Sequence, residues 1–389
     1  MKFQSETVAV QLTPPGRGAV ATVLVAGPHA TSLVDDLFHS ATGRSLADRP
    51  LDRILFGRWQ DANANAGEEI VACRRAVDQV ELHCHGGSAA SMAIIAALLE
   101  RGCRQQSWQE RTEATANDPT IAEAQAALAR ASTLRIAAIL LDQQAGALGR
   151  AVADITRLIQ AGELATAVQA IDALLRFAPL GLHLAEPWRV VLAGRPNAGK
   201  SSLINALVGY ERAIVHATPG TTRDVVTAAA AIAGWPIELA DTAGLRGGAQ
   251  PLEAAGIELA RQRLGSADLI VLVLDASVER TPDDGALLVD WPAALVVLNK
   301  SDLLAADSQG SPVSAEWLPV SALRGDGLEA FQQAIAARLV PDVPPPGQAI
   351  PFLPSHCEAL QAARQALQAG HLDAALEAVA SFIRRSQNC

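Results

Sequence analysis

Hydrophobic and polar positions divide the first 115 residues into short extended segments and one helical segment. Apolar runs typical of β-strands occur at 7–12, 21–26 and 79–83, between turn signals that include TPPGRG and HGG. Helical spacing of apolar residues occurs over 91–101. The pattern predicts a small α+β domain over residues 1–115.

The pattern changes twice in the middle of the chain. From about 120 to 175, within a helical domain part taken as 116–186, the sequence is rich in Ala, Leu, Gln and Arg at helical spacing, which predicts three helices. Over 187–340, short apolar runs such as RVVLA, DLIVLVLDA and AALVVLN alternate with helical or loop segments. This alternation is typical of βα units around a mostly parallel sheet.

Proline marks the end of this α/β region. Residues 341–354 contain six prolines and are predicted to form a stiff linker. Residues 355–389 return to helical composition, and two short helices alone bury too little surface to be stable. We therefore expect them to pack against the helices of 116–186. The predicted fold class is an α/β domain inserted in an all-α helical domain, preceded by the small α+β domain.

Composition then narrows the functional classes. A chain of 389 residues with 50% hydrophobic residues has room for two or three cores. No apolar run approaches the ~18 residues of a membrane span, and the N-terminus lacks the pattern of a signal peptide, so no membrane association is expected. Five irregularly spaced cysteines favour the cytoplasm over a disulfide framework. A net charge of −10 means that any contact with nucleic acid needs a local basic patch or a partner.

A phosphate-binding loop is the strongest chemical signal in the sequence. GRPNAGKSS, Gly194–Ser202, follows the apolar run VVLA and precedes the helical SLINALVG, in the order strand, glycine loop, helix. The glycines allow backbone N–H groups to face phosphates, and Lys200 neutralises the β and γ oxygens. The Ser201 hydroxyl can bind Mg²⁺ at the positive end of the helix.

Two downstream motifs supply groups for the metal and the γ-phosphate. DTAG, Asp241–Gly244, follows the strand-like PIELA, so Asp241 can reach the Mg²⁺ shell and the Gly244 amide can contact the γ-phosphate. TPGTTRD, residues 218–224, provides a mobile loop whose Thr222 hydroxyl can close on Mg²⁺ only when a γ-phosphate is present.

Two more motifs recognise the base. NKSD, Asn299–Asp302, follows the strand AALVVL, and the Asp302 carboxylate can accept from guanine N1–H and the exocyclic amine, which adenine does not offer. SAL, Ser321–Leu323, places backbone amides near guanine O6. The five motifs in this order predict a P-loop GTPase domain over 187–340. Its expected nucleotide-binding residues are Gly194, Asn197, Ala198, Gly199, Lys200, Ser201, Ser202, Thr221, Thr222, Asp241, Thr242, Ala243, Gly244, Asn299, Lys300, Asp302, Ser321, Ala322 and Leu323.

The residue that positions the attacking water is not the one found in Ras-like GTPases. Those proteins place Gln directly after the Asp-x-x-Gly motif, where this chain has Leu245. Two candidates replace it: Glu253, and Asn197, whose side-chain oxygen could hold a monovalent cation where an arginine finger would sit. The alternative is that Glu253 is a solvated helix residue and Asn197 a turn former. Together with Lys200 they form the expected catalytic set.

The sequence resembles the MnmE (TrmE) family of tRNA-modification GTPases. The likeness covers most of the chain and includes GRPNAGKSSLINAL, AIVHATPGTTRDV, DTAGLR, LNKSDL, ETVAVQLTPPGRGAV and VELHCHGG. It implies hydrolysis stimulated by K⁺, pairing of G domains, and a homodimer through N-terminal and G domains. It also implies a one-carbon folate in the N-terminal domain, and work with the flavoprotein MnmG on the wobble uridine of certain tRNAs. The implied K⁺ ligands are Asn197, His216, Thr218 and Thr221, and the implied catalytic glutamate is Glu253.

Departures from the family concern the folate site. Leu24 stands where the family has arginine, Pro119 stands where it has lysine, and Glu81 is kept. Two of three matched folate contacts are therefore absent, which puts folate binding in doubt. An alternative function follows: a GTP-dependent switch or interaction protein that has lost folate-dependent modification. A ribosome-assembly GTPase would share the five motifs but would not explain TPPGRG or HGG.

Two smaller features have two interpretations each. His83, Cys84 and His85 suggest a metal site, although HGG coincides with the family turn and no further ligand cluster is apparent. Three arginines suggest a basic patch for tRNA, or a solvated helix end; they are Arg101, Arg104 and Arg111.

The C-terminus also departs from the family ending FC(I/V)GK. Matched on Phe382, the family cysteine falls on Ile383, and the final glycine and lysine of the family ending are absent. The second helical part, 355–389, is therefore expected to be truncated. Cys389 is then expected to have no catalytic role.

Overall fold

The computed structural model describes residues 6–14, 18–60, 67–116, 118–210, 227–241, 265–304 and 316–384. The chain divides into two compact units, residues 1–117 and residues 118–389. Among the described helices, none has both the length and the apolarity needed to cross a bilayer.

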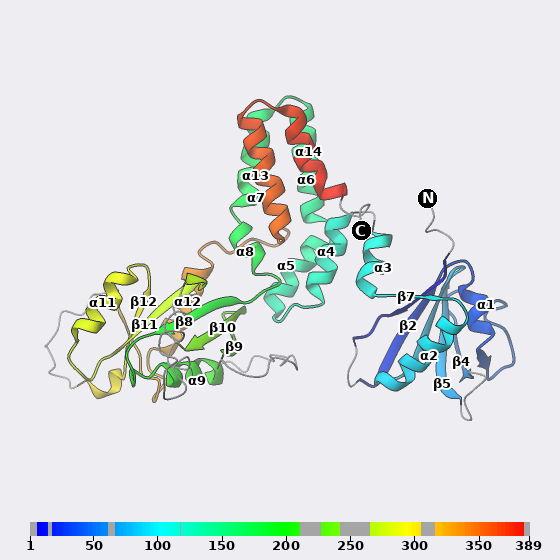
Figure 1. The fold of residues 1–389 in the computed structure, drawn as a ribbon, viewed down its shortest axis with the longest axis horizontal. Helices are drawn as coiled ribbons and strands as arrows, with labels where there is room; N and C mark the ends of the chain where they lie inside the picture. Colours follow the sequence, from blue (N-terminus) through cyan, green and yellow to red (C-terminus); the bar gives the residue numbers. More distant parts are fainter. Residues whose placement is uncertain are drawn as a thin grey trace, which may run out of the picture. The chain divides into compact units, whose positions relative to one another are not determined.

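The first unit is built on a seven-stranded sheet in the order β3-β4-β5-β6-β2-β1-β7, drawn in blue and cyan in Figure 1. Neighbouring strands are antiparallel, except for the parallel pair β1 and β7. Its elements are β1 (Val8–Gln11), β2 (Val20–Ala26), α1 (Ala30–Asp35), β3 (Phe38–Ser40), β4 (Ile54–Trp59), β5 (Glu68–Ala76), β6 (Gln79–His85), α2 (Ser88–Glu100), β7 (Arg104–Gln106) and α3 (Trp108–Thr115).

Strand β2 explains how this sheet is covered on both faces. Val23 and Val25 are fully buried in the same apolar cluster as Val34 of α1 and Ile94 of α2. Leu24, which points to the other face, joins a smaller apolar cluster against which Trp108 of α3 packs. A strand buried on both faces reads as a continuous apolar run, which is the pattern over 21–26.

The second unit begins with helices α4 (Pro119–Leu128), α5 (Leu134–Gln144), α6 (Ala147–Gln160), α7 (Leu164–Leu175) and α8 (Ala178–Leu182). Four of these helices, α4 to α7, lie in the 120–175 stretch for which the pattern predicts three, and the short α8 follows it. The breaks are local: Thr133 caps α5 by accepting from the Ile136 N–H at 3.3 Å, and Gly146 and Gly162 have positive φ angles. Apolar spacing continues across such short turns, so periodicity alone merges neighbouring helices.

A six-stranded sheet follows, in the order β13-β12-β11-β8-β10-β9, with β9 as the antiparallel edge strand. Its strands are β8 (Trp188–Ala193), β9 (Thr227–Ile232), β10 (Trp235–Asp241), β11 (Leu269–Asp275), β12 (Leu295–Asn299) and β13 (Leu318–Pro319). Its helices are α9 (Lys200–Tyr210), α11 (Pro282–Asp290) and α12 (Leu328–Leu339), with a 3₁₀ turn η2 at Ser301–Leu303. The phosphate-loop strand β8 is therefore central, between β11 and β10.

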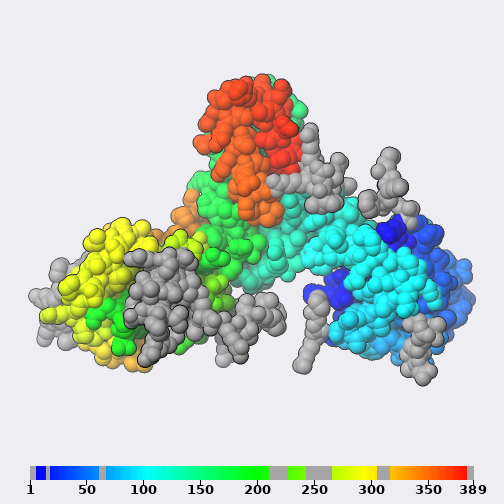
Figure 2. All heavy atoms as spheres, viewed as in Figure 1, coloured from blue at the N-terminus to red at the C-terminus, as the bar shows by residue number. Residues whose placement is uncertain are grey.

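The C-terminal helices pack on helices that precede this sheet in the sequence. Helix α13 (Pro354–Gln368) contacts α7, and α14 (Leu372–Arg384) contacts α6 and α4. Figures 1 and 2 show these orange and red helices beside the green and cyan ones. His356 of α13 is buried, and its Nε2 lies 2.8 Å from Glu123 Oε2 of α4.

The proline-rich segment between α12 and α13 is hydrogen-bonded to α5 of the same unit and is not a free spacer. The buried side chain of Gln143 donates from Nε2 to the Gln348 carbonyl at 2.9 Å and accepts at Oε1 from the Ile350 N–H at 3.1 Å. The neighbouring Asp142 carboxylate accepts from the Gly347 N–H at 2.8 Å. Proline content indicates stiffness, but it carries no information about these long-range partners.

We expect Gln143→Ala to lower the free energy of unfolding of the second unit by about 2 kcal/mol, because it leaves the half-buried Gln348 carbonyl and the buried Ile350 N–H without their partner. Urea unfolding followed by tryptophan fluorescence measures the change. Gln160→Ala, at the exposed end of α6, is the matched control. Equal unfolding midpoints for the two variants would contradict the role of Gln143.

Candidate nucleotide-binding site

The phosphate loop connects β8 to α9 and needs two close backbone approaches. Gly194 has φ +151°, and a Cβ there would lie 2.3 Å from the Val273 carbonyl oxygen of β11. Gly199 has φ +91°, and a Cβ there would lie 2.1 Å from Asn299 Nδ2. Side chains at these positions would collide with the neighbouring strands, so both residues must be glycine for the loop to sit this close to the sheet.

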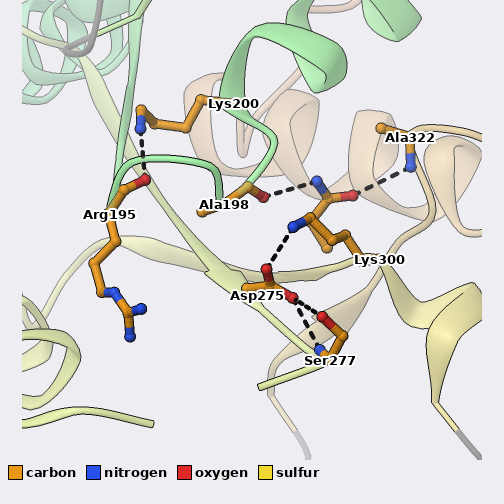
Figure 3. Close-up of polar contacts among 8 residues, drawn as sticks. Arg195, Ala198, Lys200, Asp275, Ser277, Lys300 and Ala322 are labelled. Atoms are coloured by element: carbon orange, nitrogen blue, oxygen red, sulfur yellow. Dashed lines mark hydrogen bonds and ion pairs between the residues drawn. The ribbon is translucent and has the colours of Figure 1, made fainter. Parts of the chain in front are cut away.

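Lys200 is the first residue of α9 and is buried, with 4% of its surface exposed. Its ammonium donates to the Gly194 carbonyl at 3.0 Å. It also donates to the Arg195 carbonyl at 2.9 Å, as Figure 3 shows. The positive charge is therefore held inside the loop, at the N-terminal end of a helix, where phosphate oxygens are stabilised.

Ser201 and Asp241, both predicted for Mg²⁺, lie in contact. The Ser201 hydroxyl donates to Asp241 Oδ2 at 2.6 Å, and Asp241 is 6% exposed. Strands β8 and β10 are parallel neighbours, with Leu192 opposite Asp241, so the strand end brings the carboxylate to the start of α9. A hydroxyl and a carboxylate oxygen side by side are ligands that Mg²⁺ prefers, so these residues fit the ion.

The buried side chain of Asn299 joins the phosphate loop to the base-binding segments. Its Nδ2 donates to the Ala198 carbonyl at 2.9 Å, and its Oδ1 accepts from the Ala322 N–H at 3.2 Å (Figure 3). The Ala322 amide, predicted to lie near guanine O6, is thus directed to Asn299 in this structure. Both contacts link segments that are far apart in sequence.

Lys300 follows with a left-handed backbone, φ +63°, and its ammonium contacts Asp275 Oδ2 at 2.5 Å. Asp275 ends β11 and also accepts from the Ser277 hydroxyl at 2.5 Å (Figure 3). Burial acts to raise the pKa of Asp275, but the hydrogen bonds from Lys300 and Ser277 outweigh it and hold that pKa below its usual value. The carboxylate is therefore ionised at neutral pH and fixes the Lys300 side chain.

Asp302, the predicted guanine reader, is oriented by Ser321. The Ser321 hydroxyl donates to Asp302 Oδ1 at 2.6 Å, and the same hydroxyl accepts from the Arg324 N–H at 3.1 Å. Ser321 is fully buried, whereas Leu323 is 87% exposed. The structure therefore brings the Asn299, Asp302 and Ser321 side chains together beside the phosphate loop, and Leu323 contributes only backbone to such a site.

Several predicted site residues lie outside the described part of the chain. They are His216, Thr218, Thr221, Thr222, Thr242, Ala243, Gly244, Leu245 and Glu253, together with Cys389. Sequence reasoning also missed three residues that the structure brings into this region: Asp275, Thr281 and Asp284. For Asp275 a signal existed, since an acidic residue ends a buried strand parallel to β8.

The HCHGG segment does not gather a metal site. Cys84 is buried in the cluster under the helices, while His83 Nδ1 lies 3.1 Å from Thr22 Oγ1 and His85 Nδ1 lies 2.6 Å from Glu68 Oε1. Within the described ranges, no three His, Cys, Asp or Glu side chains converge as metal ligands would.

Of the three arginines considered for a basic patch, Arg104 forms an ion pair with Glu6, with Nε and Oε2 at 3.0 Å.

The positions matched to folate contacts do not fit that ligand. Leu24 is 9% exposed and is packed with Val8 and Val10 beneath Trp108. Glu81 lies 3.7 Å from Arg75 Nε and 3.6 Å from His83 Nε2, so its carboxylate already has partners. Pro119 opens α4 as its first residue and offers no donor.

Two family models match the chain. One, described as the N-terminus of the GTP-binding protein TrmE, covers residues 7–113, and the other, described as a 50S ribosome-binding GTPase, covers residues 189–300. The tRNA modification GTPase MnmE of Chloroflexus aurantiacus is 34% identical over 406 residues, which covers 94% of this chain and 89% of that protein. The chain belongs to the MnmE family. The MnmE of Bacillus subtilis strain 168 is 33% identical, over 85% of this chain and 82% of that protein.

Among solved structures, the G domain of FeoB from Methanococcus jannaschii is 25% identical and covers 39% of this chain and 97% of its own. Its TM-score of 0.29 is too low to support an argument about function. Membership of the MnmE family therefore depends on the sequence relatives, and the nucleotide site depends on the geometry described above.

We expect Asp302→Asn to weaken GDP binding at least about 100-fold, because an amide nitrogen would face the N–H donors of guanine. The same amide can donate to the additional carbonyl of xanthine, so the variant should bind xanthosine diphosphate better than the wild type does. Calorimetric titration with both nucleotides measures the exchange of preference. Asp290→Asn, at the exposed end of α11, is the control, and unchanged GDP affinity in Asp302→Asn would contradict guanine recognition by this carboxylate.

Proposed function

We propose that this protein binds and hydrolyses GTP and that its hydrolysis serves the modification of the wobble uridine in tRNA. One observation carries the GTP-binding part: the Ser201–Asp241 contact at the end of the phosphate loop, next to the Asn299 bridge to the base-binding residues. The curated relatives named above as tRNA modification GTPases support the tRNA part.

The residues at this site account for substrate binding. When GTP is bound, the Lys200 ammonium moves from loop carbonyls to phosphate oxygens, a short displacement because it already lies within the loop. Ser201 and Asp241 would hold Mg²⁺ together with Thr222, and the ion would supply positive charge to the transferring phosphoryl group. Asp302 would select guanine, and Ser321 would keep its carboxylate in place.

K⁺ stimulation belongs to the same proposal. Asn197 lies in the phosphate loop with a left-handed backbone, φ +66°, and is exposed, so its side-chain oxygen is available to a cation beside the phosphates. His216, Thr218 and Thr221 would complete the shell, and Glu253 would position the attacking water in place of the missing Gln. The cation would act as an arginine finger does in other GTPases, by offsetting charge that develops on the phosphates.

We propose further that the helices before and after the α/β sheet form one helical domain into which the GTPase domain is inserted. The contacts of α13 with α7 and of α14 with α6 support this arrangement, as do the contacts of Gln143 with the proline-rich segment. The proposed partners are a second copy of the chain, through N-terminal and G domains, an MnmG-like flavoprotein, and tRNA. The proposed location is the cytoplasm.

The side-chain packing in the first unit favours a second function, that of a GTP-dependent switch. The packing of Leu24 beneath Trp108 and the ion pair between Arg75 and Glu81 leave no arrangement suited to folate among the described residues. These observations support a GTP-dependent switch that no longer takes part in folate-dependent modification. The two functions share the GTPase site and differ in what hydrolysis controls.

GTP turnover should be several-fold faster in KCl than in NaCl at equal ionic strength, because the larger cation would fit the proposed oxygen shell. Asn197→Gly removes the side-chain oxygen while keeping the left-handed backbone without strain, so it should bring the KCl to NaCl ratio close to one. Phosphate release assays measure both rates. A ratio near one in the wild type, or an unchanged ratio in the variant, would refute the K⁺ site.

Glu253→Ala should bind GTP normally and lose turnover, because the water that attacks the γ-phosphate would no longer be positioned. Normal turnover in this variant would assign the positioning of that water to another residue.

Deletion of the gene, followed by mass spectrometry of tRNA nucleosides, separates the two functions. Loss of modified wobble uridines, restored by the wild-type gene but not by Lys200→Ala, is expected if GTP hydrolysis serves modification. Unaltered nucleosides, also in a strain lacking any second family member, would reject that function and favour the switch.

A further inference from the structure

Arg195, the second residue of the phosphate loop, has two ends with different contacts. Its carbonyl oxygen accepts from the Lys200 ammonium at 2.9 Å. Its guanidinium points away from Lys200, as Figure 3 shows, and Nη1 donates to Thr281 Oγ1 and to Asp284 Oδ2, each at 3.1 Å. The residue therefore connects the phosphate loop to the start of helix α11.

The two residues that accept from Arg195, Thr281 and Asp284, are also held by hydrogen bonds to each other. Thr281 precedes α11, and its backbone N–H and hydroxyl donate to Asp284 Oδ2 at 2.9 and 3.0 Å. Only 8% of the Asp284 side chain is exposed. Burial acts to raise the pKa of Asp284, but the hydrogen bonds from Thr281 and Arg195 hold that pKa below its usual value. A charged donor on a well-held, ionised carboxylate forms a strong type of hydrogen bond.

The loop is held at its other end by a different residue. Asn299 binds the Ala198 carbonyl, and the backbone at Gly194 lies against Val273. Between these points the chain must keep its N–H groups directed toward the phosphates, and a loop ordered in advance loses less entropy when the ligand binds. Arg195 lies in this stretch, and its side chain reaches α11, which carries none of the predicted nucleotide-binding residues.

We propose that Arg195 is a positioning residue for nucleotide binding, which by pairing with Asp284 fixes the first turn of the phosphate loop against α11. The fixed turn holds the Arg195 carbonyl where it orients Lys200 and keeps the loop amides aimed at the phosphates. This inference rests on the proposed GTP-binding function. It assigns the α11 N-terminus, which touches no nucleotide group, a part in nucleotide affinity.

The test is a double-mutant cycle on the full chain with GDP as the probe. Arg195→Gln and Asp284→Asn should each raise the Kd for GDP about tenfold, and the double variant should raise it no further than the larger single effect. Arg195→Lys, which can still reach one acceptor, should recover much of the affinity. The Kd for GDP should change by a larger factor than the kcat for GTP at saturation, because the pair orders the loop before the nucleotide binds.

Stability measurements separate positioning from a structural role. In Arg195→Gln, Asp284 keeps both bonds from Thr281, so the start of α11 is preserved and the Tm should change by no more than about 2 °C. Arg176→Gln is the matched control, because it removes an exposed ion pair with Asp342 in the same unit. It should leave the Kd for GDP unchanged.

Each outcome decides one question. Failure of the wild-type protein to bind GDP would overturn the proposed function itself. Normal binding by both the wild type and Arg195→Gln would overturn only the positioning role, as would a double variant whose loss equals the product of the two single losses. A fall in kcat with unchanged Kd would also overturn it and place Arg195 at the reacting phosphate.

Discussion

The nucleotide site depends above all on the buried side-chain amide of Asn299. One planar group donates to the carbonyl of the phosphate loop and accepts from the N–H of the segment after β13. A buried amide must satisfy both its donor and its acceptor, so the three segments can only exist together in this register. Gly199 is forced to be glycine by the same residue, since any side chain there would meet the amide nitrogen.

The parts of this arrangement that follow from local spacing could be predicted from the sequence. The phosphate loop, the NKSD segment and the strands beside them are continuous stretches in which residue order fixes the chemistry. The ion pair of Arg195 with Asp284 joins residues 89 positions apart, and Gln143 meets Gln348 across 205 positions. No local pattern encodes such pairs, because both members are ordinary polar residues until folding brings them together. The extra helices were missed for a related reason: the capping turn at Thr133 does not interrupt apolar spacing.

The two units of the chain differ in how their family chemistry has been kept. In the second unit, Lys200 is held by a carbonyl of the phosphate loop, and the Ser201 hydroxyl donates to Asp241. In the first unit, Glu81 survives, but its carboxylate is paired with Arg75 on a neighbouring strand. The GTPase residues thus keep contacts that suit a phosphate and a metal ion, whereas the carboxylate of Glu81 lies against other charged side chains.

The small apolar cluster around Leu24 limits which side chain position 24 can hold. Trp108 packs on that cluster, and Leu24 stands directly opposite Glu81 in the strand pairing. An arginine at 24 would place a guanidinium under an indole ring and into competition with Arg75 for Glu81. The packing of the indole and the charge of Arg75 therefore act together to favour an apolar side chain at this position.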